Sequence, residues 1–247
     1  RLVDCIAPAQ GDVIVEIGPG QGMLTRALLT SGARVYAVEF DRDMVTILRK
    51  TFADTDRLTI LPLDFLTFQP QDYSLERFKL VGNIPYNITS PVIDWLLRYR
   101  ERIVMAVLMV QKELAMRIAG QPGSKDWSPL SIFTQLHFVV ERCFDVSPKS
   151  FRPPPRVDSA VIRLEPRAES AAIPPNFAAC VRAAFRHRRK QLVNNLTPDF
   201  FSSRAEAVAL LHQLGWAEKI RAEQLTIQQF LTLSRHLGTH TSSESDR

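Results

Sequence analysis

The segment DVIVEIGPGQG, residues 12–22, decides the fold, because a short apolar run carrying Glu16 leads directly into three alternating glycines. Residues 23–30 then have helical character and stop at Ser31-Gly32, so the unit reads as a strand, a glycine loop and a helix. Such a loop lets the backbone approach a ligand closely and places amide N–H groups at the start of a helix. A dinucleotide-binding fingerprint requires Gly or Ala at position 23, where this chain has Met23. The segment therefore predicts a ligand site at the end of the first strand and disfavours a dinucleotide as its ligand.

Three further strand ends carry polar groups. Residues 34–39 read as a second strand ending in Glu39, and residues 58–61 as a third with Asp64 just beyond it. Residues 78–82 form a fourth, followed at once by Asn83-Ile84-Pro85-Tyr86. Taken singly, Glu39 or Asp64 is more often a solvated acid or a helix cap, and an Asn-x-Pro sequence is often a plain turn. Because ligands of open α/β sheets bind beyond the carboxyl ends of the strands, signals at successive ends favour one binding site.

The tetrapeptide at residues 83–86 suits the recognition of a nucleobase. The Asn83 amide offers both an acceptor and a donor for the edge of a base. Pro85 fixes its own φ and biases Ile84 toward an extended conformation. Tyr86 offers a face on which a base can stack, worth roughly 1–3 kcal/mol. Core packing is the alternative role for Tyr86.

Length and composition indicate an ordinary globular protein. The 247 residues leave room for one large and one small domain, and a net charge of +5 permits a polyanionic partner. No apolar run approaches the length of a membrane span. Cys5, Cys143 and Cys180 lie far apart without His partners at ligand spacing, so we expect neither a disulfide framework nor a zinc site. The same cysteine usage fits a reducing compartment, and we therefore expect a cytoplasmic location. Since the sequence opens at Arg1 inside a helical pattern, we expect the true N-terminus, with any targeting segment, to lie upstream.

Together these motifs resemble the class I S-adenosylmethionine (SAM)-dependent methyltransferases, and the Asn-Ile-Pro-Tyr tetrapeptide is that of adenine-N6 enzymes. More narrowly, the chain resembles the ribosomal RNA adenine N6,N6-dimethyltransferases, above all their bacterial small-subunit members. Further matches are QKE at 111–113, PGSK at 122–125 and FRPPPRVDSA at 151–160. A Gln-Asn-Phe-Leu segment that helps to close the SAM site in the family is absent. The resemblance implies an α/β fold with a Rossmann-like seven-stranded methyltransferase sheet and a small C-terminal all-α domain.

The resemblance also implies an activity, SAM-dependent dimethylation of adenines in small-subunit ribosomal RNA on a partly assembled particle, by a monomer without a metal. It assigns cofactor binding to Glu16, Gly18, Gly20, Gly22, Glu39, Phe40, Asp64, Phe65 and Asn83. Glu39 is expected to accept the ribose hydroxyls and Asp64 the adenine amino group, with Phe65 or Leu66 near the ring.

The same resemblance makes Asn83, Ile84, Pro85, Tyr86 and Phe151 the catalytic set. Asn83 Oδ1 and the Ile84 carbonyl would accept the two amino hydrogens of the target adenine. That arrangement turns the nitrogen lone pair toward the methyl group. Tyr86 would stack on one face of the base and Phe151 on the other, with core packing again the alternative for Phe151.

The C-terminal third reads as a separate, helical domain. A Pro-, Ala- and Ser-rich stretch at 165–175 separates a catalytic domain, 1–168, from an RNA-recognition domain, 169–247, whose tail we expect to be disordered from about 239. Residues 177–195 read as one helix, followed by helices at 205–214 and 222–237. The first carries five cations, Arg182, Arg186, Arg188, Arg189 and Lys190, and positions 182, 186, 189 and 190 share a face. A solvated charged face is the alternative, but five cations without an acid favour RNA phosphates.

Residues 103–110 read as a central strand, and 136–144 and 157–164 as a final antiparallel pair. Two other functions remain open. One is a large-subunit ribosomal RNA methyltransferase of the antibiotic-resistance type, ranked lower because residues 185–192 look like small-subunit members. The other is a non-catalytic nucleic-acid-binding factor, disfavoured by the intact set of motif residues.

Overall fold

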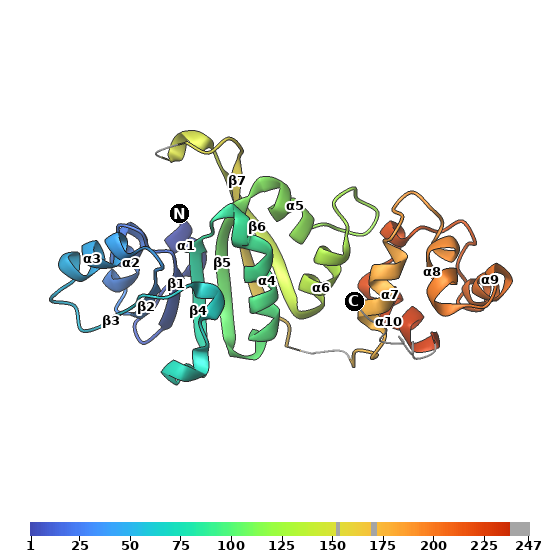
Figure 1. Cartoon of the computed structure of the whole chain (residues 1–247), viewed down its shortest axis with the longest axis horizontal. Helices are drawn as coiled ribbons and strands as arrows, with labels where there is room; N and C mark the ends of the chain where they lie inside the picture. Colours follow the sequence, from blue (N-terminus) through green and yellow to red (C-terminus); the bar gives the residue numbers. More distant parts are fainter. Residues whose placement is uncertain (152–153, 169–171, 238–247) are drawn as a thin grey trace. The chain divides into compact units, whose positions relative to one another are not determined.

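The computed structural model describes residues 1–151, 154–168 and 172–237, which form two compact units (Figure 1). Unit 1 comprises Arg1–Ala119 and His137–Ala168, and unit 2 comprises Gly120–Leu136 and Glu169–Arg247. The segment Gly120–Leu136, which the sequence placed in the first domain, thus belongs with the helical unit. Trp127 explains this, because its side chain is buried and its indole Nε1 donates to the Leu225 carbonyl at 2.9 Å. The tail predicted to be disordered from about 239 lies outside the described residues.

Unit 1 is built on a seven-stranded sheet with the order β3-β2-β1-β4-β5-β7-β6. Its strands are β1 (Val13–Ile17), β2 (Arg34–Val38), β3 (Leu58–Leu61), β4 (Phe78–Asn83), β5 (Ile103–Gln111), β6 (Phe138–Val146) and β7 (Ser159–Pro166). The first five are parallel, and β7 runs antiparallel between β5 and β6. This order confirms the predicted Rossmann-like methyltransferase sheet.

Apolar side chains cover both faces of the sheet, which explains why its strands read as almost continuous apolar runs. On one face, the cluster that includes Val35 and Val81 takes in residues of α1 (Leu2–Ile6), α2 (Met23–Thr30) and α3 (Arg42–Thr51). Strand residues alternate between faces, so Tyr36 instead meets Tyr73, with ring centroids 6.4 Å apart. On that second face Trp95 of α4 (Thr89–Arg98) packs against aromatic rings that include Phe78. α5 (Lys112–Ile118) follows β5 and packs near β6 and β7.

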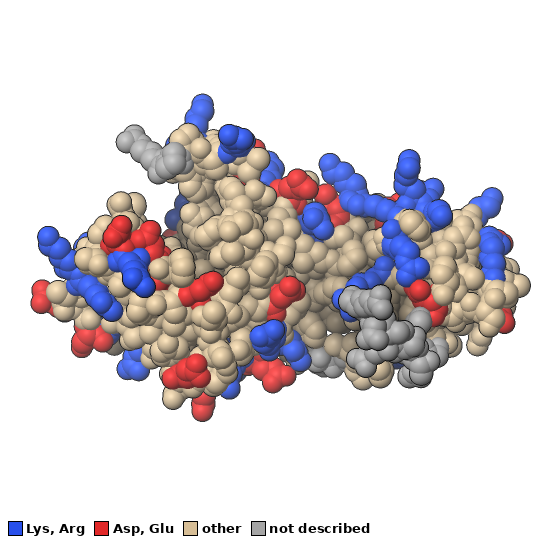
Figure 2. Space-filling model, viewed as in Figure 1, with Lys and Arg blue, Asp and Glu red and all other residues tan. Residues whose placement is uncertain are grey.

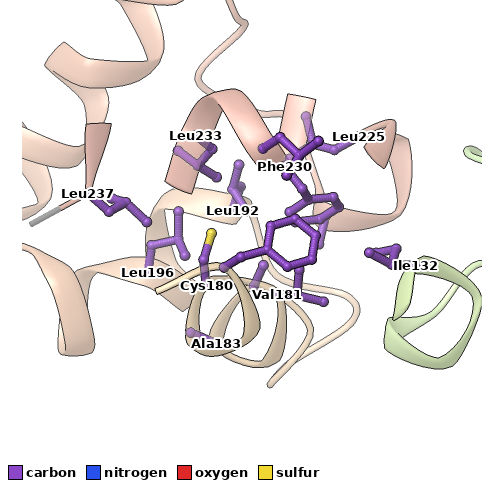
Figure 3. Close-up of a cluster of buried hydrophobic side chains, with 14 of the residues drawn as sticks. Ile132, Cys180, Val181, Ala183, Leu192, Leu196, Leu225, Phe230, Leu233 and Leu237 are labelled. Atoms are coloured by element: carbon purple, nitrogen blue, oxygen red, sulfur yellow. The ribbon is translucent and has the colours of Figure 1, made fainter. Parts of the chain in front are cut away.

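Unit 2 is helical, as predicted, and its side chains converge on one core (Figure 3). Its helices are α6 (Pro129–His137), α7 (Phe177–Ala184), α8 (Leu192–Phe200), α9 (Arg204–Gln213) and α10 (Ile227–His236). The sequence analysis predicted no helix at the position of α6, and the strand expected at 136–144 begins only at Phe138. No helix in the described ranges of the chain is long and apolar enough to cross a bilayer.

The single helix predicted over 177–195 is wrong, because the chain turns between α7 and α8. Asn195 is buried, and its Nδ2 donates to the carbonyls of Ala184 at 2.6 Å and His187 at 3.1 Å. Those bonds satisfy carbonyls that the end of α7 leaves without helical partners. Apolar residues of both helices join the same core. The apolar residues of the sequence therefore keep a helical spacing across the turn, as they would in a single helix. Arg182 therefore lies on α7, whereas residues 186–190 lie in the turn.

Candidate active site

Backbone N–H groups of the glycine loop donate hydrogen bonds to the end of β2 and to Glu39 just beyond it. Gly18 N donates to the Val38 carbonyl at 3.0 Å, and Gly20 N donates to Glu39 Oε2 at 3.0 Å. The second oxygen of Glu39 accepts from Asp41 N at 2.9 Å. The Glu39 carboxylate is thus held in a fixed orientation beside the loop, and the residue is largely buried.

The three loop glycines serve two different purposes. All have positive φ, at +60° for Gly18, +56° for Gly20 and +81° for Gly22, where other residues are strained. A Cβ at Gly18 or Gly20 would meet nothing within 4 Å, so open space lies beside the loop. A Cβ at Gly22 would lie 2.5 Å from Phe52 Cε2 of the segment after α3. The first two glycines border a space that a ligand can enter, and the third permits packing.

Glu16 lies beneath the loop as a buried acid. Its carboxylate accepts from Thr25 Oγ1 of α2 at 2.6 Å, and its exposure is 1%. The pKa of Glu16 is raised to about 7, chiefly by burial and also by the nearby charge of Glu39, while the Thr25 hydroxyl opposes the rise. A site that holds one buried acid with a pKa near 7 and a second acid close by favours a ligand with positive charge or hydrogen-bond donors.

The residues beyond β2 and β3 lie in contrasting environments. Asp64 caps the short helix η1 (Phe65–Thr67), where its Oδ1 accepts from Leu66 N at 2.9 Å. Phe65 is only 4% exposed and packs against Trp95, with centroids 4.7 Å apart, so its ring belongs to the aromatic core. Leu66 keeps part of its surface exposed, and Phe40 is 77% exposed. Of the two apolar neighbours expected near the cofactor ring, Leu66 is the more accessible.

The tetrapeptide after β4 forms one wall of a pocket of about 320 Å³. Asn83 is exposed at the strand end, and Ile84 is buried, with its N–H donating to the Met109 carbonyl at 3.0 Å. Pro85 and Tyr86 complete this wall, and Phe151, Pro154 and Pro155 line the other. The structure thus brings the five predicted catalytic residues to one pocket.

Two residues near this pocket were not singled out from the sequence. The Tyr86 hydroxyl shares a hydrogen bond of 2.9 Å with Ser159 Oγ, at the start of β7. Gly82 allows β4 to approach β1 closely, because a Cβ there would lie 2.8 Å from the Ile17 carbonyl oxygen. Ser159 belongs to the 151–160 motif, but nothing in that motif indicates its partner. Among the residues that the structure describes, no group of three or more His, Cys, Asp and Glu could hold a metal.

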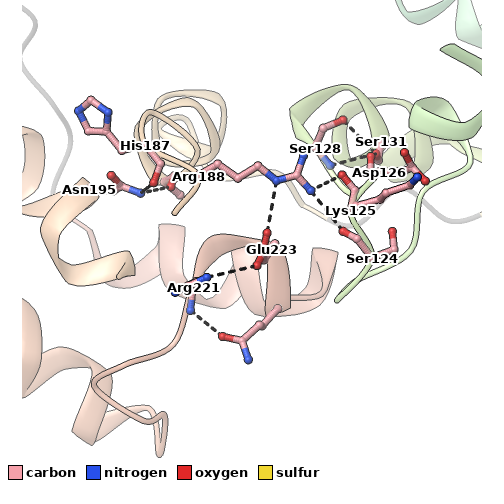
Figure 4. Close-up of polar contacts among 12 residues, drawn as sticks. Ser124, Lys125, Asp126, Ser128, Ser131, His187, Arg188, Asn195, Arg221 and Glu223 are labelled. Atoms are coloured by element: carbon pink, nitrogen blue, oxygen red, sulfur yellow. Dashed lines mark hydrogen bonds and ion pairs between the residues drawn. The ribbon is translucent and has the colours of Figure 1, made fainter. Parts of the chain in front are cut away.

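The basic residues of unit 2 divide into two groups. Arg186 forms an ion pair with Asp199, and Arg182 lies over the Phe133 ring at 5.8 Å. Arg188 Nε contacts Glu223 Oε2 at 3.3 Å, and its Nη2 donates to the Ser124 carbonyl at 3.4 Å and to the Lys125 carbonyl (Figure 4). Arg189 and Lys190 are exposed and form no ion pair within residues 1–151, 154–168 and 172–237. Figure 2 shows Lys and Arg side chains gathered on unit 2 near the α7–α8 connection.

The one-sided helix face predicted for positions 182, 186, 189 and 190 is therefore wrong. Residues 186–190 instead line a concave surface of the turn, with a volume of about 460 Å³. Of the five predicted RNA contacts, Arg189 and Lys190 are the two with neither an ion pair nor a ring contact among the residues that the structure describes, and Arg188 fastens the turn to the 124–125 loop.

Comparison with known proteins identifies close relatives over nearly the whole chain. A family model described as ribosomal RNA adenine dimethylase matches residues 1–238. Ribosomal RNA small subunit methyltransferase A of Pseudomonas aeruginosa is 40% identical over 243 residues, which cover 96% of this chain and 88% of the relative. The protein of the same name from Laribacter hongkongensis is 40% identical over 245 residues, with 96% and 89% covered.

Solved structures agree with this. The crystal structure of a dimethyladenosine transferase from Plasmodium falciparum has a TM-score of 0.80 and 27% identity, covering 94% of this chain and 92% of that one. The 23S rRNA methyltransferase ErmE has a TM-score of 0.77 and 30% identity, covering 95% and 94%. Both alignments extend over almost the full length of this chain.

Proposed function

Since the chain belongs to the ribosomal RNA adenine dimethylase family, we propose that it transfers methyl groups from SAM to the N6 atoms of adenines in small-subunit ribosomal RNA. The observation that carries this proposal is the position of the 320 Å³ pocket. It adjoins β4, the neighbour of the strand that leads into the glycine loop, so a methyl donor and an acceptor can be held at one sheet edge.

The residues around the glycine loop fit the cofactor. SAM, when bound, supplies an activated methyl group on a sulfonium. Gly18 and Gly20 leave open space beside their backbone, so a ligand can approach the loop. The Glu39 carboxylate, oriented by two backbone amides, accepts from the ribose hydroxyls, and Asp64 accepts from the adenine amino group. The buried acid at Glu16 favours the positive charge of the ligand.

The tetrapeptide holds the target base. Asn83 Oδ1 and the Ile84 carbonyl accept the two amino hydrogens, which aims the nitrogen lone pair out of the ring plane and stabilises positive charge as it develops. Tyr86 and Phe151, which both line the pocket, bind the two faces of the base. No strong general base is required, because the nitrogen becomes acidic once it is alkylated. Since the base must leave its stack, the substrate is unpaired RNA or a flipped adenine.

Unit 2 contributes to RNA binding. The exposed cations Arg189 and Lys190 contact phosphates, with Arg182 and Arg186 as further contacts and Arg188 in an internal role. The natural partner in this proposal is an immature small ribosomal subunit, bound by a monomer in the cytoplasm.

Methyl incorporation tests the activity directly. Purified protein with labelled SAM should methylate small-subunit particles that lack the modification, and mass spectrometry of digested RNA should detect N6,N6-dimethyladenosine. Absence of incorporation into particles and naked RNA, despite measurable cofactor binding, would exclude the proposal in favour of a non-catalytic RNA-binding factor.

A second candidate function is methylation of large-subunit RNA, favoured by the structural similarity to ErmE. The same assay with unmodified large-subunit RNA separates the two. Incorporation there, and not into small subunits, would assign the chain to the second function.

A further inference from the structure

A side-chain hydrogen bond joins one wall of the base pocket to the start of β7. One wall is formed by residues 83–86, and the other by Phe151, Pro154 and Pro155. The Tyr86 hydroxyl reaches from the first wall to Ser159 Oγ, 2.9 Å away. Ser159 begins β7, four residues after Pro155, the last residue of the second wall.

Ser159 is a rigid anchor. Its exposure is 0%, and its backbone lies between two strands, opposite Gln111 of β5 and Val146 of β6. The preceding residue is also held, because the Asp158 carbonyl accepts from Lys112 N at 2.9 Å. The hydroxyl oxygen of Ser159 is therefore fixed by the sheet before Tyr86 contacts it.

The Tyr86 side chain is less confined, because it is only half-buried. Tyr86 begins the short helix η3 (Tyr86–Ile88), which fixes its backbone but not the rotamer of its ring. A phenol ring fixed only through its Cα would swing about χ1 into the pocket or away from it. The bond at the far end of the ring removes that freedom.

We propose that Ser159 is a positioning residue for the target base: its bond to Tyr86 holds the aromatic face at a set distance from the opposite wall. This inference rests on the proposed function, because it assigns the pocket to an adenine. With Tyr86 held in this way, the pocket admits one flat base and its stacking surface is already in place. Binding of the base then carries no entropy cost for ordering the Tyr86 ring. A purely structural role for the bond, as the partner of a buried hydroxyl, predicts a change in stability and none in base binding.

The test is a double-mutant cycle with Tyr86→Phe, Ser159→Ala and the combined variant. Tyr86→Phe keeps the ring and the fold of β7 while removing the bond, so the cycle stays informative if Ser159→Ala folds poorly. Base binding is read as quenching of 2-aminopurine riboside fluorescence, which reports stacking without methyl transfer. Single-turnover methyl transfer to small-subunit RNA and cofactor affinity are measured in parallel.

We expect each single variant to weaken quenching affinity and to slow transfer by about 2- to 10-fold, the loss expected of one neutral hydrogen bond. Cofactor affinity should not change, and the combined variant should be no worse than either single one. Ser234→Ala is the matched control, because it removes another buried serine hydroxyl, one that donates to the Phe230 carbonyl in α10, and it should leave quenching and transfer unchanged.

The role of Ser159 would be overturned if Tyr86→Phe quenched the probe as strongly as the wild type. It would also be overturned if the loss in the combined variant equalled the product of the two single losses. Failure of the wild-type protein to quench the probe would overturn it as well, by removing the base from the pocket. A wild-type protein that quenches and shows the coupling but transfers no methyl group would leave the inference standing and sink the proposed function.

Discussion

At the scale of single residues, Asn83 is the side chain on which the proposed chemistry depends most directly. Its amide is exposed at the end of β4, next to a backbone fixed by the Ile84–Met109 hydrogen bond. We expect Asn83→Ala to lower single-turnover methyl transfer by roughly 100-fold, the size of effect seen when one pre-organised group is removed from a charge-stabilising site. Cofactor affinity, measured by calorimetry, should persist. Asn87→Ala, at an exposed position four residues on, is the control, and survival of transfer in Asn83→Ala would remove the residue from the mechanism.

Glu16 makes a pH-dependent contribution to stability. Its pKa is about 7 in the folded protein against an ordinary 4.5, so the folded state binds the proton more tightly. The contribution of Glu16 to the free energy of unfolding is therefore largest below about pH 4.5. It falls as the pH rises toward 7, by at most about 1.4 kcal/mol per pH unit. We expect Glu16→Gln to gain stability relative to wild type between pH 5 and 8, as measured by thermal unfolding without cofactor. Glu76→Gln, at an exposed position, should follow the wild-type curve, and a parallel curve for Glu16→Gln would contradict the prediction.

At the scale of elements, the glycine loop offers a matched pair of substitutions. Gly22→Ala would bring a methyl group within 2.5 Å of Phe52 and 2.9 Å of Leu48, in a backbone with φ of +81°. We expect it to cost about 2–5 kcal/mol in denaturant unfolding, because backbone strain of about 1–2 kcal/mol adds to overpacking of about 1–3 kcal/mol. Gly18→Ala meets nothing within 4 Å and bears only the strain of φ at +60°, about 1–2 kcal/mol.

The two variants should differ most in ligand binding. The methyl group of Gly18→Ala occupies the open space beside the loop, so SAM affinity should fall although the fold survives. Gly22→Ala should lose stability first, with affinity per folded molecule less affected. Equal losses of affinity in both, measured by calorimetry on folded protein, would show that the open space at Gly18 is not a ligand site.

The strands could be predicted from the sequence far better than the helices of unit 2. Val13–Ile17 and Ile103–Gln111 are mostly buried, so each is an apolar run bounded by polar residues or turns. The break between α7 and α8 depends on Asn195, whose partners are carbonyls eight and eleven residues away. Trp127 likewise joins its helical unit through a bond to Leu225, 98 residues away in sequence. Such long-range contacts leave no periodic signal.

The candidate site shows the same division. Polar residues at successive parallel strand ends could be predicted to converge, because sheet topology alone brings Glu16, Glu39 and Asn83 to one edge. The environment of each could not. Phe65 reads as a possible ring contact, yet its burial against Trp95 depends on η1 and α4 packing together. The partner of Tyr86 lies 73 residues away, on a strand that enters the sheet out of sequence order.

At the scale of the whole molecule, a catalytic unit and a basic helical unit occupy separate parts of one chain, so chemistry and RNA affinity should be separable. Arg189 and Lys190 have no ion pair in the parts of the chain that the structure describes, whereas Arg188 is engaged with Glu223 and two carbonyls. A cation that releases counterions from a phosphate contributes to the salt dependence of binding, and one already paired within the protein contributes less.

We therefore expect Arg189→Gln and Lys190→Gln each to weaken RNA binding and to reduce the slope of log K against log salt by about 1. Arg188→Gln is the control from the same turn: its loss should lower stability more than it changes the slope, because it unfastens the 124–125 loop. Filter binding at several salt concentrations measures the slopes, and thermal unfolding measures the stabilities. Cofactor affinity should be unchanged in all three variants, because the glycine loop belongs to the other unit. A larger slope change for Arg188 than for Arg189 would mean that the internal contacts open when RNA binds, and that the turn, not the exposed pair alone, forms the phosphate surface.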